Sequence, residues 1–237
     1  MGKKLSVSLV FLTFYRLDFT KRAVLHNIEN AGYPIDEIIF LDNGSTDGTK
    51  EWIKENFPKA KKIFNKENKG IAEGYNQLYG KVGKVDLIAR PSSDMCMPKD
   101  WLKDMVEWHE KIPKTGIVGM ISRSYLPHKE KRYLGKEIEI DGFKIQPANT
   151  LGSIVFKKEL IDLKLPEYGL YGYDDTIWTE KVRKAGYVNY YIDGVVEDFP
   201  QEEYEKYPQY VQWKMRQIQK LEKEKPELLE LNKFING

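Results

Sequence analysis

The chain has 237 residues, of which 41% are hydrophobic and 31% charged, a balance typical of a soluble globular protein with a substantial core. Its 38 basic and 36 acidic side chains give a formal net charge of only +2, so the overall charge does not indicate nucleic-acid binding. The single cysteine, Cys96, excludes an internal disulfide, and the scattered histidines argue against a His/Cys zinc site.

The N-terminal segment has two lysines followed by an apolar run, as a signal peptide does. From Leu5 to Phe14, however, serines alternate with apolar residues, and no small-residue cleavage site follows. We therefore interpret this run as a half-buried first strand. No stretch of the sequence is long and apolar enough to cross a bilayer, so we expect a cytoplasmic protein.

After the first strand, segments with strand patterns alternate with segments whose apolar residues recur at helical spacing. This order predicts an α/β fold with a mostly parallel central sheet and helices on both of its faces. Further strands are expected at residues 37–41, 61–65, 85–89 and 115–122, and helices at residues 19–31, 49–57, 71–79 and 98–111.

The alternation breaks in a polar stretch at residues 123–146. Asp141-Gly142 lies there between two short alternating segments, which predicts a small β-hairpin insertion. The later elements are expected as a strand at 153–156, a helix at 176–185 and a strand at 188–192.

The C-terminal part of the chain is rich in Glu, Lys and Gln, which favours helices. We predict one domain over residues 1–200 and a C-terminal helical extension over residues 201–237. This helical tail is expected to lie against the domain or against a second subunit, and the second arrangement would make the protein a homodimer.

Polar clusters stand where predicted strands end. Asp42 follows the second strand, Ser92-Ser93-Asp94 follows a later one, and Asp174-Asp175 precedes the last helix of the domain. Ligands of open α/β sheets bind beyond the carboxyl ends of the strands, so these clusters predict a binding site there.

The segment from Asp42 to Thr49 combines carboxylates, hydroxyls and glycines. Asp42 can accept a hydrogen bond from the imide N–H of a base, which favours uracil, or it can bond its own backbone in a turn. Asp47 can bind a ligand or cap the helix that follows. Gly44 and Gly48 allow close backbone approach or positive φ.

This segment resembles the first signature of family 2 glycosyltransferases, which have the GT-A fold. Later segments are similar to further motifs of the family in the same order, so the resemblance covers Leu5 to Asp198 and implies a GT-A-like catalytic domain. These segments are Asn68-Lys69-Gly70-Ile71-Ala72 with Asn76, the stretch from Pro91 to Leu102, residues 152–158, and Asp174-Asp175 with the helix after it.

The resemblance implies a nucleotide-diphosphate sugar, most simply a UDP-sugar, as donor, and a divalent metal, Mn²⁺ or Mg²⁺, as cofactor. The residues that we place on the donor side are Thr13, Tyr15, Arg16, Asp42, Asn43, Ser45, Asn68, Gly70, Asn76, Ser92 and Ser93.

Asp94 is the main candidate for a metal ligand, because hard cations choose carboxylate oxygens and neutralise charge on a leaving diphosphate. It could instead be an acidic residue favoured near a helix N-terminus. The family's first Asp falls on Ser92 here, which removes a charge and lowers the expected metal affinity. The family's further His ligand aligns near Glu197 or Asp198, and we assign Asp198; both could also be solvated loop charges.

Asp174 and Asp175 are the catalytic candidates. By register with the family, Asp175 takes the proton of the acceptor hydroxyl and Asp174 supports it; the alternative is that one of them caps the helix. Direct attack with one carboxylate on the acceptor side inverts the anomeric centre. Tyr171 and Tyr173 are candidates for stacking on an acceptor sugar.

The acceptor itself is a hydroxyl-bearing molecule whose class the sequence leaves open: a glycan, a lipid-linked sugar, a protein or a modified nucleic acid. The cations Arg123, Lys129, Lys131 and Arg132 in the polar insertion either hold a phosphate or an anionic acceptor or form a solvated loop.

Two other functions fit part of the pattern. A nucleotidyltransferase of similar fold would have a glycine-rich basic loop after the first strand, and residues 13–18 contain no glycine. A non-catalytic sugar-nucleotide or glycan-binding module agrees with Ser92 and the missing His, but the Asp174-Asp175 pair argues against it.

Overall fold

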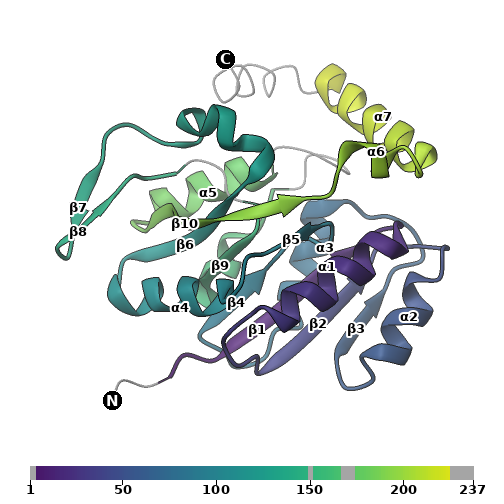
Figure 1. The fold of residues 1–237 in the computed structure, drawn as a ribbon, viewed down its shortest axis with the longest axis horizontal. Coiled ribbons are helices and arrows are strands. Elements are labelled where there is room, and N and C mark those ends of the chain that lie inside the picture. The colour runs from purple at the N-terminus through teal and green to yellow at the C-terminus, as the bar shows by residue number, and fades with distance from the viewer. Residues whose placement is uncertain (1–3, 149–151, 167–173, 225–237) are drawn as a thin grey trace.

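The computed structural model describes residues 4–148, 152–166 and 174–224, and it confirms the α/β fold (Figure 1). The strands of the large sheet are β1 (Val7–Thr13), β2 (Glu37–Asp42), β3 (Lys61–Phe64), β4 (Leu87–Arg90), β5 (Met95–Cys96), β6 (Thr115–Ser122), β9 (Ile154–Lys157) and β10 (Val188–Asp198). The α-helices of the domain are α1 (Leu17–Glu29), α2 (Thr49–Asn56), α3 (Ile71–Tyr79), α4 (Trp101–Lys111) and α5 (Asp174–Lys184).

The strand order in the sheet is β3-β2-β1-β4-β9-β6-β10-β5. The first four strands of this order are parallel, and β10 is parallel to β6. The strand β9 runs antiparallel to both β4 and β6, so these two strands point the same way. The carboxyl ends of β1, β4, β6 and β10 therefore meet at one edge of the sheet, where the sequence predicted a site.

Both faces of the sheet are covered by helices, which explains its continuous apolar strands. In β1, Leu9 and Phe11 pack with residues of α1, α2 and α4, while the intervening Val10 packs with residues of α3 and α5. The prediction that the first strand is half-buried was wrong: successive side chains of a strand point to opposite faces, and in β1 both sets are buried, Ser8 included, because helices cover both sides of the sheet.

The predicted hairpin is present. The strands β7 (Ile138–Ile140) and β8 (Phe143–Ile145) pair antiparallel and are joined by Asp141 and Gly142, whose φ angles of 51° and 82° are both positive. Such a two-residue turn matches the twist of the strands that it joins. In Figure 1 the hairpin projects from the domain on the side away from β3.

The last strand is longer than the sequence pattern predicted. It was expected to end at Ile192, but β10 continues to Asp198 through a register shift between Tyr191 and Val195. Gly194, with φ +129°, lies in this irregular stretch, and the polar Asp193-Gly194 pair interrupts the apolar pattern. The extension brings Asp198 into register with Met95 of β5, beside Asp94.

The predicted helical tail begins with α6 (Gln201–Tyr204) and α7 (Pro208–Glu224). Tyr204 and Tyr207 make edge contacts with the ring of Phe19, and Trp213 packs on Phe14 at 4.9 Å between ring centroids. The tail therefore lies against its own domain, and a homodimer through it stays a prediction. Within the described ranges, no helix has both the length and the apolar character that crossing a membrane requires.

His109 of α4 is enclosed in the core. One ring nitrogen, Nε2, bonds to the Val155 carbonyl oxygen at 3.1 Å, while Nδ1 has no partner among the described residues. Burial lowers the pKa of His109 from its ordinary value of 6.5 to about 4, because a charged imidazolium would be poorly solvated there. Between these pH values the unfolded chain binds a proton that the folded chain does not, so folding stability falls as the pH falls.

We therefore expect acidification from pH 7 to pH 4 to remove about 3 kcal/mol more unfolding free energy from the wild type than from His109→Gln. Glutamine can donate to the same carbonyl but does not titrate, so the comparison cancels the carboxylates that both proteins share. Urea unfolding at a series of pH values measures the difference. Parallel curves for the two proteins would contradict this role of His109.

Candidate functional site

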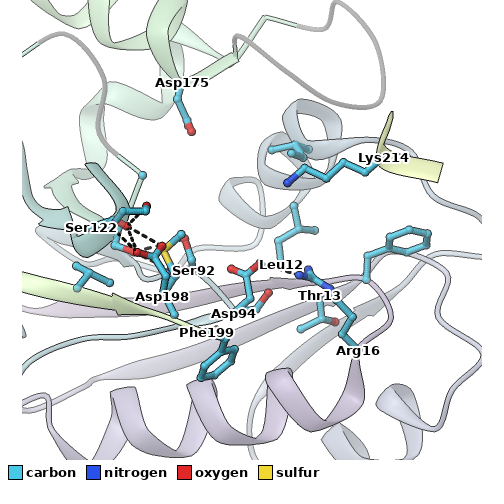
Figure 2. Close-up of a pocket in the computed structure, with 18 of the residues that line it drawn as sticks. Leu12, Thr13, Arg16, Ser92, Asp94, Ser122, Asp175, Asp198, Phe199 and Lys214 are labelled. Carbon is cyan, nitrogen blue, oxygen red and sulfur yellow. Dashed lines mark hydrogen bonds and ion pairs between the residues drawn. The ribbon is translucent and has the colours of Figure 1, made fainter. Parts of the chain in front are cut away.

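A cleft of about 790 Å³ opens at the carboxyl edge of the sheet. Figure 2 shows Asp175 pointing into it from one side, with Asp94 and Asp198 on the other. The residues predicted for the site that line this cleft are Thr13, Arg16, Asn43, Asn68, Ser92, Ser93, Asp94, Asp175 and Asp198.

Asp94 is paired with Arg16, a residue 78 positions away in the chain. The guanidinium Nη1 lies 2.8 Å from Asp94 Oδ2, and Tyr204 Oη donates to the same oxygen at 3.4 Å. Arg16 also stacks on Tyr210 at 4.0 Å. Although burial opposes its charge, Asp94 and the tyrosines raise the pKa of Arg16 above its ordinary value, so this side of the cleft holds a permanent cation.

The loop that presents Arg16 is conformationally unusual. Tyr15 and Arg16 have positive φ angles of 52° and 60°, which costs free energy for residues other than glycine. Two side chains of the predicted first motif hold the loop: Ser45 Oγ accepts from Tyr15 N at 2.8 Å, and Asp47 Oδ2 accepts from Leu17 N at 3.0 Å. The motif after β2 thus determines where Arg16 meets Asp94.

Asp47 lies just before α2, although the N-cap of that helix is Gly48 and no side chain caps it. Asp47 Oδ1 accepts from the backbone N and the hydroxyl of Thr49, the first residue of α2, at 3.2 and 2.6 Å. One carboxylate therefore joins the start of α2 to the start of α1.

Asp198, the second predicted metal ligand, also lines the cleft, and in Figure 2 Asp94 is drawn between Asp198 and Arg16. Ser122 Oγ lies 2.6 and 2.5 Å from the two carboxylate oxygens of Asp198, and Ser124 N donates to Oδ2 at 2.9 Å. Glu197, the other residue considered for this metal ligand, does not line the cleft and forms an exposed ion pair with Arg123. Within the described part of the chain, no group of three or more His, Cys, Asp or Glu side chains could hold a metal.

Asp175 lies in the first turn of α5, and Arg90 at the end of β4 holds it. Arg90 Nη2 donates to Asp175 Oδ1 at 2.6 Å, while no hydrogen bond from a described residue reaches Oδ2. The Asp175 side chain is 34% exposed. Among the described residues, one carboxylate oxygen is thus fixed and the other has no partner.

Arg90 is fully buried and is itself held on several sides. It stacks on Tyr75 at 4.5 Å, and its Nη1 donates to Tyr79 Oη at 3.3 Å. Burial opposes its charge, but Tyr79 and Asp175 raise the pKa of Arg90 well above its ordinary value. Arg90 was not among the residues predicted for the site, although a charged side chain at the end of a buried apolar strand is a signal of an internal ion pair.

Asn43 joins the segments of the predicted donor side. Its amide nitrogen donates to Asn68 Oδ1 at 2.8 Å and to the Gly70 carbonyl at 3.0 Å. Its oxygen accepts from Asn65 Nδ2 and Lys69 N, each at 3.0 Å. The two predicted nucleotide-side segments are therefore joined through one buried side chain.

Asp42 does not line the cleft. It is fully buried, and its two oxygens accept from Thr13 Oγ1 at 3.1 Å and from Ser45 N at 2.9 Å. This is the backbone-bonding role that the sequence left open, beneath the cleft residues Thr13 and Asn43. Contact between Asp42 and a nucleotide base stays a prediction.

Other predicted donor residues also lie outside the cleft lining. Tyr15 and Ser45 shape the loop before α1, and Gly70 accepts from Asn43. Asn76 instead pairs with the backbone of Leu165: its Nδ2 donates to the carbonyl at 3.1 Å, and its Oδ1 accepts from the N–H at 3.0 Å.

Part of the predicted acceptor side lies beyond the described residues. Tyr171 and Tyr173 fall there entirely, and the side chain of Asp174 is likewise not described. In the described part, the tail contributes cleft residues that local patterns did not indicate. They are Tyr204, Tyr210, Val211, Trp213, Lys214 and Met215.

The profile described as Glycosyl transferase family 2 matches residues 8–159 of the chain. This region includes the motifs after β2 and β4, but ends before Asp175, Asp198 and the helical tail. No curated protein sequence matches the chain.

Solved structures share its fold. The mannosyltransferase PcManGT from Pyrobaculum calidifontis, in complex with GDP-Man and Mn²⁺, matches with a TM-score of 0.67 and 20% identity, covering 84% of this chain and 58% of that one. S. aureus TarS 1–349 matches with a TM-score of 0.59 and 16% identity, covering 85% and 63%. GalNAc-T7 with UDP, GalNAc and Mn²⁺ matches with a TM-score of 0.63 and 14% identity, covering 84% and 44%.

These likenesses confirm the predicted GT-A-like fold. The chain spans less than two thirds of the length of each of these solved proteins.

Proposed function

Because this chain belongs to glycosyl transferase family 2, we propose that it moves a sugar from a nucleotide-diphosphate donor to a hydroxyl group of an acceptor. The observation that carries the proposal is the convergence of Asp94, Asp198 and Asp175, from three separate segments, on one cleft. Two of the similar solved structures contain a nucleotide sugar or a nucleotide together with Mn²⁺, which supports a donor of this class. Membership of this family favours sugar transfer over the nucleotidyltransferase hypothesis.

The residues around Asp94 fit a divalent cation of the Mg²⁺ or Mn²⁺ type. Such ions are bound through one or two carboxylates together with substrate phosphates, so a third acidic ligand is not required, and we place the cation at Asp94 with Asp198 as the second carboxylate. Asp94 Oδ1 has no partner among the described residues, while Oδ2 accepts a hydrogen bond from Arg16. Bound there, the cation would neutralise charge on the diphosphate.

Arg16 supplies a second positive charge on this side of the cleft. The family's first Asp is Ser92 here, so the cleft has one carboxylate less than the family pattern and one buried guanidinium next to the remaining one. We infer that Arg16 helps to hold the donor diphosphate, because guanidinium groups bind phosphate oxygens in paired hydrogen bonds.

On the acceptor side, Asp175 is the proposed general base. Its free oxygen Oδ2 takes the proton of the acceptor hydroxyl as the hydroxyl oxygen attacks the anomeric carbon, and the nucleotide diphosphate leaves. Arg90 keeps the carboxylate oriented by holding Oδ1. With a single carboxylate on this side, direct displacement inverts the anomeric centre.

We propose UDP as the nucleotide, on the ground that a carboxylate at Asp42 can accept from the imide N–H of uracil. To do so, Asp42 would exchange its present partners Thr13 and Ser45 for the base. The mannosyltransferase neighbour holds a guanine nucleotide, and guanine also has a ring N–H that a carboxylate can accept from. GDP is therefore the nucleotide to compare with UDP.

Thermal unfolding with Mn²⁺ and each of UDP, GDP and ADP tests the proposal. A ligand at 100 times its Kd stabilises the folded state by about 2.7 kcal/mol, which raises the unfolding midpoint of a chain of this size by about 5–10 °C. We expect that increase for UDP and little change for ADP, which has no imide. A larger increase with GDP would reassign the base, and no increase with any nucleotide would contradict the donor.

A further inference from the structure

The polar insertion after β6 places one of its cations in the cleft. The segment η1 (Arg123–Arg132) begins with Arg123, which is exposed and paired with Glu197, and ends with Arg132, which is 9% exposed and lines the cleft. Lys129 and Lys131 are not among the lining residues in the part of the chain that the structure describes. The insertion therefore buries one guanidinium at the site and leaves its other cations outside.

Arg132 has no counter-charge in the part of the chain that the structure describes. Among the described residues, no carboxylate forms an ion pair with it, and the contact that the structure records is stacking on the ring of Tyr125 at 3.8 Å. The nearby carboxylate Asp175 is already paired with Arg90. Burying an unpaired charge is costly, so a guanidinium held in this way is expected to meet an anion from outside the chain.

Its position is built into the fold rather than left to a free loop. Tyr133, the next residue, forms a β-bridge with Ala148 and packs its ring on Tyr191 at 5.9 Å. Ala148 N donates in turn to the Asn189 carbonyl of β10 at 2.7 Å. The guanidinium is thus pre-positioned next to β10, and Asn189 of the same strand donates to the Thr179 carbonyl of α5, the helix that carries Asp175, at 2.8 Å.

We propose that Arg132 binds an oxyanion of the acceptor, a phosphate or a carboxylate group close to the hydroxyl that reacts. This inference rests on the proposed function and adds the chemical class of the acceptor to it. Two features assign the anion to the acceptor rather than to the donor. Arg132 is held beside β10, which is bonded to the helix of Asp175, the proposed base, and the donor side has its own buried cation in Arg16, at Asp94. Stacking on Tyr125 leaves the edge of the guanidinium for paired hydrogen bonds.

The test uses the full chain with UDP and Mn²⁺ present, so that the donor side is filled. Unfolding midpoints are measured against sodium sulfate and, separately, sodium acetate, with ionic strength held constant by sodium chloride. Sulfate stands for a phosphate group and acetate for a carboxylate group. Because sulfate also stabilises proteins in general, binding at the site is taken as the difference in unfolding midpoint between wild type and variant at the same sulfate concentration.

We expect a saturable response to one of these anions in the wild type and in Arg123→Gln, the matched control from the same segment. In Arg132→Gln the apparent anion affinity should fall about tenfold or more, and in Arg132→Lys, which keeps the charge without the planar fork, it should fall less. Circular dichroism of each variant shows that the fold is kept.

Two results would overturn the proposal. Equal anion responses in Arg132→Gln and wild type would remove Arg132 as the site. An anion response of the wild type that is seen in a parallel titration without UDP but is lost with UDP present, together with weaker UDP binding by Arg132→Gln, would show that the guanidinium holds the donor diphosphate. Failure of UDP to bind the wild type would instead contradict the proposed function, while the anion comparison between variants would still stand.

Discussion

Asp175→Asn is expected to lower the rate of sugar transfer by about 10²–10⁴-fold while leaving nucleotide affinity within about twofold of wild type. The amide cannot take the proton of the acceptor hydroxyl, but its oxygen can still accept the hydrogen bond from Arg90. Transfer is measured as release of the nucleotide diphosphate in the presence of acceptor, and affinity by calorimetry with UDP and Mn²⁺. Transfer at the wild-type rate would exclude Asp175 as the base.

Two controls separate chemistry from folding in this experiment. Glu180→Gln removes a carboxylate from the same helix, where Glu180 forms an exposed ion pair with Lys184, so it should leave transfer unchanged. Asp175→Asn also leaves the charge of Arg90 without its counter-ion, and breaking such a pair lowers stability. Circular dichroism at the assay temperature shows whether the variant is still folded.

Transfer that is lost in Asp175→Asn, with binding retained, would also decide against the non-catalytic alternative. Binding alone does not require a carboxylate with one oxygen fixed by Arg90 and the other without a partner among the described residues. The arrangement of Arg90 and Asp175 is what a base requires, because the orientation of the reactive oxygen is set before the acceptor arrives.

Asp94→Asn is expected to weaken Mn²⁺-dependent UDP binding by about 100-fold, because it removes the carboxylate charge that a divalent ion needs beside the diphosphate. Calorimetry with UDP in the presence and absence of Mn²⁺ measures the effect. The asparagine oxygen can still accept from Arg16, which limits the structural consequence for the tail residues around it.

Glu197→Gln is the matched control for Asp94, because Glu197 lies on β10 one residue before Asp198 but forms an exposed ion pair with Arg123. It should bind UDP as the wild type does. Two results together would exclude Asp94 as a metal ligand: equal UDP affinity of the wild type with and without Mn²⁺, and UDP affinity of Asp94→Asn equal to that of the wild type. Arg16 would then be the main positive charge for the diphosphate.

The secondary structure of this protein follows from patterns that lie within a few residues of each other. Apolar runs such as Thr115–Ser122 indicate strands, and Asp141-Gly142 favours a two-residue turn because both residues can adopt positive φ angles. The polar clusters after β2 and β4 could be placed at one edge of a sheet because parallel strands end on the same side. These features depend on neighbours in the chain, so the sequence by itself determined them.

Partnerships between distant residues were decided only in three dimensions. Arg16 meets Asp94 across 78 positions, and Arg90 meets Asp175 across 85. A residue's own surroundings in the chain say nothing about a partner so far away, and each of these arginines is compatible locally with a loop or a strand end. The sequence therefore indicated the carboxylates and Arg16, but neither Arg90 nor the pairing of each arginine with its carboxylate.

The same reason applies to the ends of elements and to the tail. The strand β10 reaches Asp198 because its irregular stretch at Gly194 is accommodated beside β6, and α7 contributes Tyr210 and Trp213 to the cleft because their rings pack on Phe14. Hydrophobic periodicity reports that a segment has a face to bury, but not which surface covers it. Composition and spacing thus determined the elements and the chemistry available at their ends, whereas the shape and charge of the cleft were settled by packing between segments far apart in the chain.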